Sequence, residues 1–171
     1  MNDIAGVISR FANSFDLKDW EGLKNVLAEL IDLDYTDLRG TRETLSREQY
    51  VALRRTALQE LDTQHILSNL DIQVDGKHAS CVASAIIFRK RDEERFDTHA
   101  IYRFGLVNEA SSWHISSIKQ TVLWNDGNPN IHVGAATDAK QLRRIDPSAA
   151  CGRRLSEGKL SAWFRRTGSP R

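Results

Sequence analysis

Two residues far apart in the sequence, His65 and Asp16, have the chemical types needed for proton transfer. His65 stands between a charged helical stretch and a strand-like run, and Asp16 stands where a first helix gives way to a second. Histidine titrates near neutrality, so its neutral form can accept a proton. A carboxylate on the other ring nitrogen fixes the tautomer and stabilises the imidazolium that forms. If the fold brings these residues together, the chain holds a pair suited to general-base catalysis.

The elements that would position this pair begin with helices. Apolar residues recur at the spacing of one helical face in three stretches of the first half of the chain. Asp19 and Ser46 are candidate N-caps for the second and third stretches. We therefore predict helices over residues 2–14, 19–30 and 46–61, a short strand over 31–36, and a turn at 39–41.

From residue 65 onward the apolar period changes from helical to alternating, which is typical of half-buried strands. Asp75-Gly76 is a strong signal for a two-residue hairpin. Helices followed by a meander of strands indicate an α+β fold, with helices on one face of a curved antiparallel sheet. The predicted strands cover residues 66–74, 78–90, 96–107 and 112–124.

Composition narrows the class of protein. Hydrophobic content of 40% and charged content of 27% are ordinary for a soluble globular protein. The sequence has no run of about 18 apolar residues, so no membrane span is expected. The first residues lack the basic flank and apolar core of a secretory signal. Cys81 and Cys151 have no metal-ligand spacing and suit free thiols, so a cytoplasmic location is expected.

The net charge of +1 hides an asymmetry along the chain. Residues 1–132 carry 15 basic against 20 acidic side chains, whereas residues 133–171 carry nine against three. We therefore predict a domain over 1–132 and a basic, partly ordered C-terminal extension over 133–171. A solvated terminus is favoured over nucleic-acid binding for this extension, because the body of the chain is acidic.

Six short segments, in this order and spacing, resemble a known family. They lie after the first helix, before the central loop, before the strand meander, at the hairpin, in the last strand and at its end. The segments are Phe15-Asp16-Leu17-Lys18-Asp19-Trp20, Leu33-Asp34-Tyr35-Thr36, Thr63-Gln64-His65, Val74-Asp75-Gly76-Lys77-His78-Ala79, Ser112-Trp113-His114-Ile115 and Trp124-Asn125-Asp126-Gly127-Asn128. Together they are similar to the SnoaL-like branch of the nuclear transport factor 2-like superfamily, over residues 4 to 131.

The resemblance implies a cone-shaped α+β barrel with a deep apolar pocket and three N-terminal helices on the concave face of the sheet. In dehydratases and a dehydrochlorinase of this group, an aspartate orients a histidine that acts as the general base. Asp16 and His65 correspond to these residues. A pocket tyrosine is also common in the group, and Tyr35 or Tyr102 could serve, with Tyr35 favoured by its place before the loop.

The chain also departs from the pattern of the group. Scytalone dehydratase uses a second histidine on the strand after the base, whereas residues 87–89 here are Ile, Phe and Arg. His99 lies one strand later. The acid that would assist a leaving group therefore stays unassigned by the sequence.

Further candidates for the pocket are aromatic. Trp124 stands at a strand end near the expected mouth, and Trp20, Tyr102 and His99 are the other candidate lining residues. Core packing is the alternative for Trp20. The histidines and carboxylates show no metal-ligand spacing, and the chain has no phosphate-binding loop, so neither a metal nor a cofactor is expected.

Two functions remain open from the sequence. One is a cofactor-independent lyase of dehydratase type, or an isomerase, acting on a small apolar molecule, such as a cyclic one, through Asp16, His65 and Tyr35. The other is a non-catalytic member of the same fold that binds a ligand or a protein. The resemblance also implies a homodimer formed through the exposed face of the sheet, for which four apolar residues are candidates: Ile87, Tyr102, Phe104 and Ile118.

Overall fold

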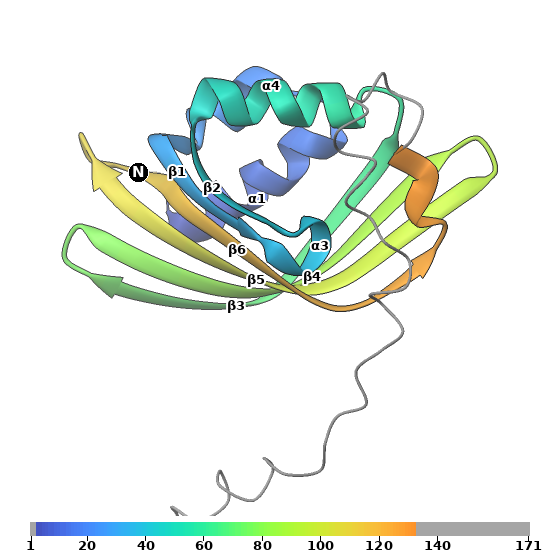
Figure 1. Cartoon of the computed structure of the whole chain (residues 1–171). Helices are drawn as coiled ribbons and strands as arrows, with labels where there is room; N and C mark the ends of the chain where they lie inside the picture. Colours follow the sequence, from blue (N-terminus) through green and yellow to red (C-terminus); the bar gives the residue numbers. More distant parts are fainter. Residues whose placement is uncertain (1–2, 133–171) are drawn as a thin grey trace, which may run out of the picture. The chain divides into compact units, whose positions relative to one another are not determined.

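The structure is a computed structural model and describes residues 3–132, so the predicted extension over 133–171 lies outside the described residues. The described part contains both helices and strands, which Figure 1 shows in their arrangement in space. The elements are α1 (Ile4–Asp16), α2 (Trp20–Asn25), β1 (Leu27–Tyr35), α3 (Thr36–Arg39), β2 (Thr41–Ser46), α4 (Arg47–Leu58), β3 (Asp62–Asp75), β4 (His78–Arg91), β5 (Glu94–Glu109), β6 (Ser112–Gly127) and the short 3₁₀ helix η1 (Pro129–His132).

The strands form one sheet in the order β2-β1-β6-β5-β4-β3. β1 runs parallel to β6, and the other neighbours are antiparallel, so the sheet is mixed. The sheet is open and strongly curved, and α1 and α4 lie over its concave face (Figure 1). This arrangement confirms the predicted α+β class and the placement of the helices.

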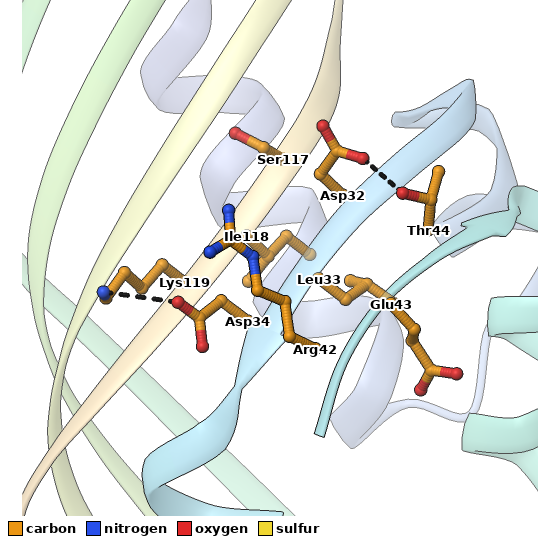
Figure 2. Close-up of a pocket in the computed structure, with 9 residues that line it drawn as sticks. All are labelled: Asp32, Leu33, Asp34, Arg42, Glu43, Thr44, Ser117, Ile118 and Lys119. Carbon is orange, nitrogen blue, oxygen red and sulfur yellow. Dashed lines mark hydrogen bonds and ion pairs between the residues drawn. The ribbon is translucent and has the colours of Figure 1, made fainter. Parts of the chain in front are cut away.

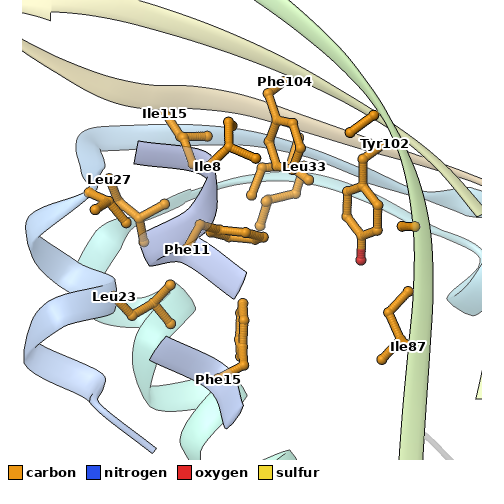
Figure 3. Packing of buried hydrophobic residues seen from close by; sticks show 14 of the residues in the cluster. Ile8, Phe11, Phe15, Leu23, Leu27, Leu33, Ile87, Tyr102, Phe104 and Ile115 are labelled. Atoms are coloured by element: carbon orange, nitrogen blue, oxygen red, sulfur yellow. The ribbon is translucent and has the colours of Figure 1, made fainter. Parts of the chain in front are cut away.

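Alternation along β4 shows which residues face the helices. Cys81, Ala83, Ala85, Ile87 and Arg89 are all buried, whereas the residues between them are partly exposed. Residues paired across neighbouring strands point to the same face of a sheet. The buried set therefore marks the concave face, where sheet side chains meet the apolar face of α1 and form the core (Figure 3).

The four residues predicted for a dimer surface lie on this concave face instead of the exposed one. Ile87, Tyr102, Phe104 and Ile118 are between 0% and 6% exposed and belong to the core. The prediction of their position was wrong because alternation gives two faces and does not say which one the helices cover.

The second helix is shorter than predicted. It begins after the N-cap Asp19 as expected, but ends at Asn25, and β1 starts at Leu27. The pairing of β1 with β6 contains a register shift between Leu27 and Asp32. Leu27, Ala28 and Ile31 are all buried around this irregularity. Their spacing imitates one face of a helix, which explains the error.

The sequence pattern also missed β2. This strand, Thr41–Ser46, is polar and largely exposed, and it lies at the edge of the sheet. Gly40 precedes it with φ of 69° and ends α3, so the predicted turn is present. The N-terminus of α4 follows the sequence closely: Ser46 Oγ accepts from the Gln49 N–H at 3.2 Å, and Gln49 Oε1 accepts from the Ser46 N–H at 3.0 Å.

No helix in residues 3–132 is long and apolar enough to cross a membrane. Cys81 is a free, buried thiol, and Cys151 lies outside the described residues.

Candidate active site

His65 and Asp16 meet although 49 residues separate them in the sequence. The distance from His65 Nδ1 to Asp16 Oδ1 is 2.6 Å, and the His65 backbone N–H donates to Asp16 Oδ2 at 2.7 Å. The His65 side chain is 10% exposed and that of Asp16 is 20% exposed. An ionised carboxylate only accepts hydrogen bonds, so this contact places the proton of a neutral His65 ring on Nδ1.

The other ring nitrogen of His65 is available. Nε2 has no hydrogen-bond partner among the described residues, and it is not sealed from solvent. In the tautomer set by Asp16, Nε2 carries a lone pair. His65 pairs with Ile87 across β3 and β4, so its side chain shares the concave face. The pair can therefore accept a proton from a molecule on that face.

Two neighbours fix the geometry of the pair. Thr63 Oγ1 donates to Asp16 Oδ1 at 3.1 Å from the beginning of β3. The Phe15 ring stacks on the imidazole of His65, with centroids 5.1 Å apart. Asp16 is the last residue of α1 and Thr63 the second residue of β3, so two element ends hold the site.

Lys18 ties this region to α4. It adopts a left-handed conformation with φ of 57°, in the turn between α1 and α2. Its Nζ donates to the carbonyls of Leu58 at 3.0 Å and Leu61 at 2.6 Å. Burial lowers the pKa of Lys18, and the charges of Asp62 and Asp16 oppose that shift. The lysine thus stabilises the end of α4 beside the strand that carries His65.

All three tyrosines of the chain are buried on the concave side. The hydroxyls of Tyr35 and Tyr50 lie 3.0 Å apart, and the Tyr102 hydroxyl accepts from Gln120 Nε2 at 2.9 Å. Burial, with the nearby Tyr35, raises the pKa of both Tyr50 and Tyr102, so these phenols stay protonated at neutral pH. Figure 3 shows the Tyr102 hydroxyl directed away from the sheet, toward the side on which Phe15 and Ile87 lie.

Three arginines lie near these tyrosines. The Arg54 guanidinium is 5.8 Å from the Tyr35 ring centroid and 5.5 Å from that of Tyr50, and Arg39 is 6.0 Å from the Tyr35 ring. Arg89 is 6% exposed and donates from Nη1 to Thr98 Oγ1 at 2.9 Å. The concave face therefore carries a polar, cationic group of side chains beside its apolar core.

The structure separates the predicted site residues into two groups. Asp16, His65, Tyr35 and Tyr102 lie on the concave side, and Trp20 packs edge-on against Phe15 with centroids 6.5 Å apart. His99 and Trp124 lie elsewhere.

His99 and Trp124 occupy the outer face of the sheet. Thr98 beside His99 is fully buried, so adjacent side chains on β5 point to opposite faces. His99 pairs with Ile86 and Trp124 and stacks on the Trp124 ring at 4.2 Å, and Trp124 is 55% exposed. The prediction that they line the pocket with His65 disagrees with this geometry.

Sequence reasoning missed Thr63, Tyr50, Arg54, Arg89 and Gln120. A signal existed for Arg89, because it stands two residues after Ile87 and so continues the alternation of buried positions along β4. No pattern in the sequence indicated that a hydroxyl on α4 would meet a hydroxyl on β1.

Two surface grooves differ in how close they come to the pair. One, of about 550 Å³, crosses β2, β1 and β6 and includes the contacts Asp34–Lys119 at 3.3 Å and Asp32–Thr44 at 2.6 Å (Figure 2). The other, of about 480 Å³, lies at the ends of β3, β4 and β5 and reaches Thr63 and Arg89. Neither groove is lined by Asp16 or His65. In residues 3–132, no group of three or more His, Cys, Asp or Glu side chains could hold a metal ion.

A comparison with models of protein families shows to which family the chain belongs. The model of the SnoaL-like domain matches residues 1–119. The chain belongs to the SnoaL-like family. This result confirms the resemblance predicted from the sequence, and it places the chain in the nuclear transport factor 2-like superfamily. No curated protein matches this SnoaL-like chain.

Solved structures share the SnoaL-like fold at low identity. The Kfla4162 protein of Kribbella flavida is 20% identical, with a TM-score of 0.72 over 77% of this chain and 95% of its own. A presumed scytalone dehydratase of Novosphingobium aromaticivorans is 16% identical, with a TM-score of 0.65 over 73% and 85%. A type 3 hexachlorocyclohexane dehydrochlorinase of Novosphingobium barchaimii is 14% identical, with a TM-score of 0.63 over 75% and 90%. These likenesses show the fold alone.

Proposed function

We propose that this SnoaL-like protein is a cofactor-independent lyase of dehydratase type, in which His65 is the general base. The observation that carries the proposal is the 2.6 Å contact from His65 Nδ1 to Asp16, with Nε2 left unpaired and open. The names of two structural neighbours, a dehydratase and a dehydrochlorinase, both describe elimination reactions and support the same class.

The proposed reaction begins with proton abstraction. His65 Nε2 removes a proton from a carbon next to a substrate carbonyl, and the electron pair of the C–H bond moves toward that carbonyl. Asp16 stabilises the imidazolium that forms. The electron pair then forms a carbon–carbon double bond as a hydroxyl on the next carbon departs, and the imidazolium returns its proton so that water leaves. General-base catalysis of this kind contributes about 10²–10⁴-fold in rate.

The Tyr35–Tyr50 pair supplies the hydrogen-bond donor for the substrate oxygen. One hydroxyl donates to the other across 3.0 Å, so the accepting hydroxyl keeps its own hydrogen for a ligand. A donor aimed at an oxygen that gains negative charge stabilises the transition state. The proposal gives Tyr35 the positioning role, with Tyr50 as its hydrogen-bond partner. An isomerase would use the same first step and return the proton to a different carbon.

The test follows the first step directly. The wild-type protein and the His65→Ala variant are incubated in D₂O with a panel of small cyclic and aromatic β-hydroxy ketones. Proton NMR measures loss of the α-proton, and absorbance measures the conjugated product. We expect the exchange rate to fall by about 10²–10⁴-fold in His65→Ala.

His78→Ala is the matched control, because His78 is an exposed histidine at the β3–β4 turn. It should exchange the α-proton as fast as wild type. Equal rates in wild type and His65→Ala would end the proposal. Binding of a panel member without His65-dependent exchange would favour the non-catalytic ligand-binding alternative.

A further inference from the structure

The three arginines of the concave face lack carboxylate partners. In residues 3–132, none of the ion pairs involves Arg39, Arg54 or Arg89. The carboxylate of Asp97 raises the pKa of Arg89 but makes no ion pair with it; Asp97 Oδ2 pairs with Arg95 at 2.9 Å, and Asp97 Oδ1 is buried without a hydrogen-bond partner among the described residues. Arg89 is buried, and Arg39 and Arg54 are half-buried. Burying unpaired charge is costly, so this group of cations indicates a missing counter-ion.

The hydrogen-bond donors of these arginines are also largely unused. A guanidinium has five N–H donors in a fixed fork. Within the described part of the chain, the side-chain bond from Arg89 to Thr98 is the single hydrogen bond that these three groups make. Arg54 Nε is enclosed and has no partner, and the buried Gln120 Oε1 has none either. The aromatic faces of Tyr35 and Tyr50 compensate Arg54 only in part.

The charges persist at neutral pH and act on one another. Burial, with the neighbouring charge of Arg54, lowers the pKa of Arg39 to about 9. Burial lowers the pKa of Arg89 to about 10. Both values lie above neutrality, so the groups remain cationic. Burial is the largest cause of both shifts, and the charge of Arg54 lowers each pKa further.

Arg89 is the arginine of this group that lies near the base. Arg89 is two residues beyond Ile87, the β4 partner of His65, and Arg89 donates to Thr98, the β5 partner of Ile87. Arg89 and His65 are thus diagonal neighbours on the concave face, a relation that places side chains about 7–8 Å apart at their origins. A single small molecule can reach both.

We propose that the ligand of the concave face is a small organic acid whose carboxylate is held by Arg39, Arg54 and Arg89. This inference rests on the function proposed above, because it uses the same site on the concave face. It adds that the ligand at this site carries a negative charge. Planar guanidinium forks match a carboxylate in a bidentate manner. Apolar side chains on the same face, Ile87 next to Arg89 along β4 and Phe15 stacked on His65, suit the carbon skeleton of an organic acid better than an inorganic anion.

The experiment compares ligands of one shape and different charge. Isothermal titration calorimetry measures binding of benzoate and cyclohexanecarboxylate, of the two corresponding carboxamides, and of inorganic phosphate, to the full chain. We expect the acids to bind wild type at least tenfold more tightly than their amides and than phosphate. Equal binding of acid and amide, absence of acid binding, or tighter binding of phosphate would each overturn the proposal.

Variants then assign the site. Arg54→Gln and Arg89→Gln should weaken acid binding by roughly 10- to 100-fold, the value of a charge-assisted hydrogen bond, with amide binding unchanged. Arg55→Gln is the matched control, because Arg55 is an exposed neighbour on α4. A cooperative thermal transition shows that a variant is folded. If Arg54→Gln or Arg89→Gln lacks one, Arg39→Gln takes its place, because Arg39 is half-buried. Equal acid affinity in Arg54→Gln and Arg55→Gln would place the anion elsewhere and refute the assignment.

The outcome is separable from that of the proposed lyase activity. His65→Ala should retain acid binding while losing α-proton exchange. Acid binding without exchange in wild type would uphold the organic-acid ligand and reject the lyase. His65-dependent exchange of neutral ketones, with no binding of either acid, would uphold the lyase and reject the organic-acid ligand.

Discussion

The two oxygens of Asp16 have different partners, and this division fixes the orientation of His65. Oδ2 accepts the backbone N–H of His65, and Oδ1 accepts both the imidazole Nδ1–H and the Thr63 hydroxyl. The carboxylate therefore binds the strand and the ring together. Thr63 is a positioning residue in this arrangement, because it acts on the base through Asp16.

Thr63→Val removes one hydrogen bond to Asp16 and keeps the β-branched shape. We expect kcat for the substrate found by the exchange assay to fall roughly tenfold, with KM unchanged, since a hydrogen bond to a charged group is worth about 1.5–3 kcal/mol and Asp16 keeps its other partners. Steady-state kinetics measure both constants.

Thr41→Val serves as the control, because Thr41 lies on the edge strand β2 and its side chain makes no hydrogen bond within the described chain. A Thr63→Val enzyme with the kcat of Thr41→Val would show that the Thr63 hydroxyl has no part in orienting the base.

The residues of this site differ in how far the sequence could reveal them. Asp16 is the last residue of α1 and His65 lies near the beginning of β3, where periodicity changes and a polar residue breaks the pattern. Tyr50 and Arg54 lie inside α4, one turn apart, and look like ordinary members of an amphipathic helix. Their roles depend on which strand faces that helix, and single-sequence periodicity does not carry that information.

At the scale of elements, the junction of β1 and α3 depends on one carboxylate. Asp34 Oδ1 accepts from the Thr36 hydroxyl at 2.8 Å and from the Thr36 N–H at 3.2 Å, and Oδ2 pairs with Lys119 on β6 at 3.3 Å. These bonds to Thr36, and then Lys119, lower the pKa of Asp34 below its ordinary value of 3.8. The residue links the start of α3 to the sheet.

The lowered pKa predicts a pH dependence of stability. A carboxyl whose folded pKa is depressed contributes stability above its unfolded pKa, and that contribution is lost as pH falls through the folded pKa. Asp34→Asn should therefore have a slightly lower Tm than wild type at neutral pH, and the difference should close as pH falls below 3.8. Thermal denaturation followed by circular dichroism between acid and neutral pH measures the gap.

Asp75→Asn is the comparison variant, because Asp75 is an exposed carboxylate at the β3–β4 turn whose side chain has no hydrogen bond or ion pair among the described residues. Its Tm should track wild type across the range. A gap for Asp34→Asn that stays constant down to the most acidic pH would contradict a role for the ionised carboxylate.

The elements differ in how well apolar periodicity in the sequence predicts their boundaries. Long strands such as β4 and β5 alternate regularly, so their existence and nearly all of their length could be predicted. β1 could not, because its irregular pairing with β6 buries Leu27, Ala28 and Ile31 at a helical spacing. The sequence of β2 is polar, so it gave no apolar signal. As an edge strand, β2 can leave its side chains and one row of backbone groups to water.

At the scale of the whole molecule, the outer face of the sheet carries a row of aliphatic and aromatic side chains. Register pairs align Ile66, Ile86, His99 and Trp124 across β3, β4, β5 and β6, opposite the helices. Ile66 is 43% exposed and Trp124 is 55% exposed, and the His99 and Trp124 rings stack. A contiguous exposed apolar patch on a sheet face is a candidate interface.

We therefore expect two copies of the chain to pair through this row, which keeps the predicted homodimer but replaces the residues first considered for it. A charge at the centre of such an interface would be buried without a partner on association, so Trp124→Glu should give a monomer. Leu53→Glu is the matched control, because Leu53 is 47% exposed on α4 and lies over the other face of the sheet. Size-exclusion chromatography with light scattering should show a dimer for wild type and Leu53→Glu. A monomeric wild-type peak at micromolar concentration, or a dimer that survives Trp124→Glu, would exclude this interface.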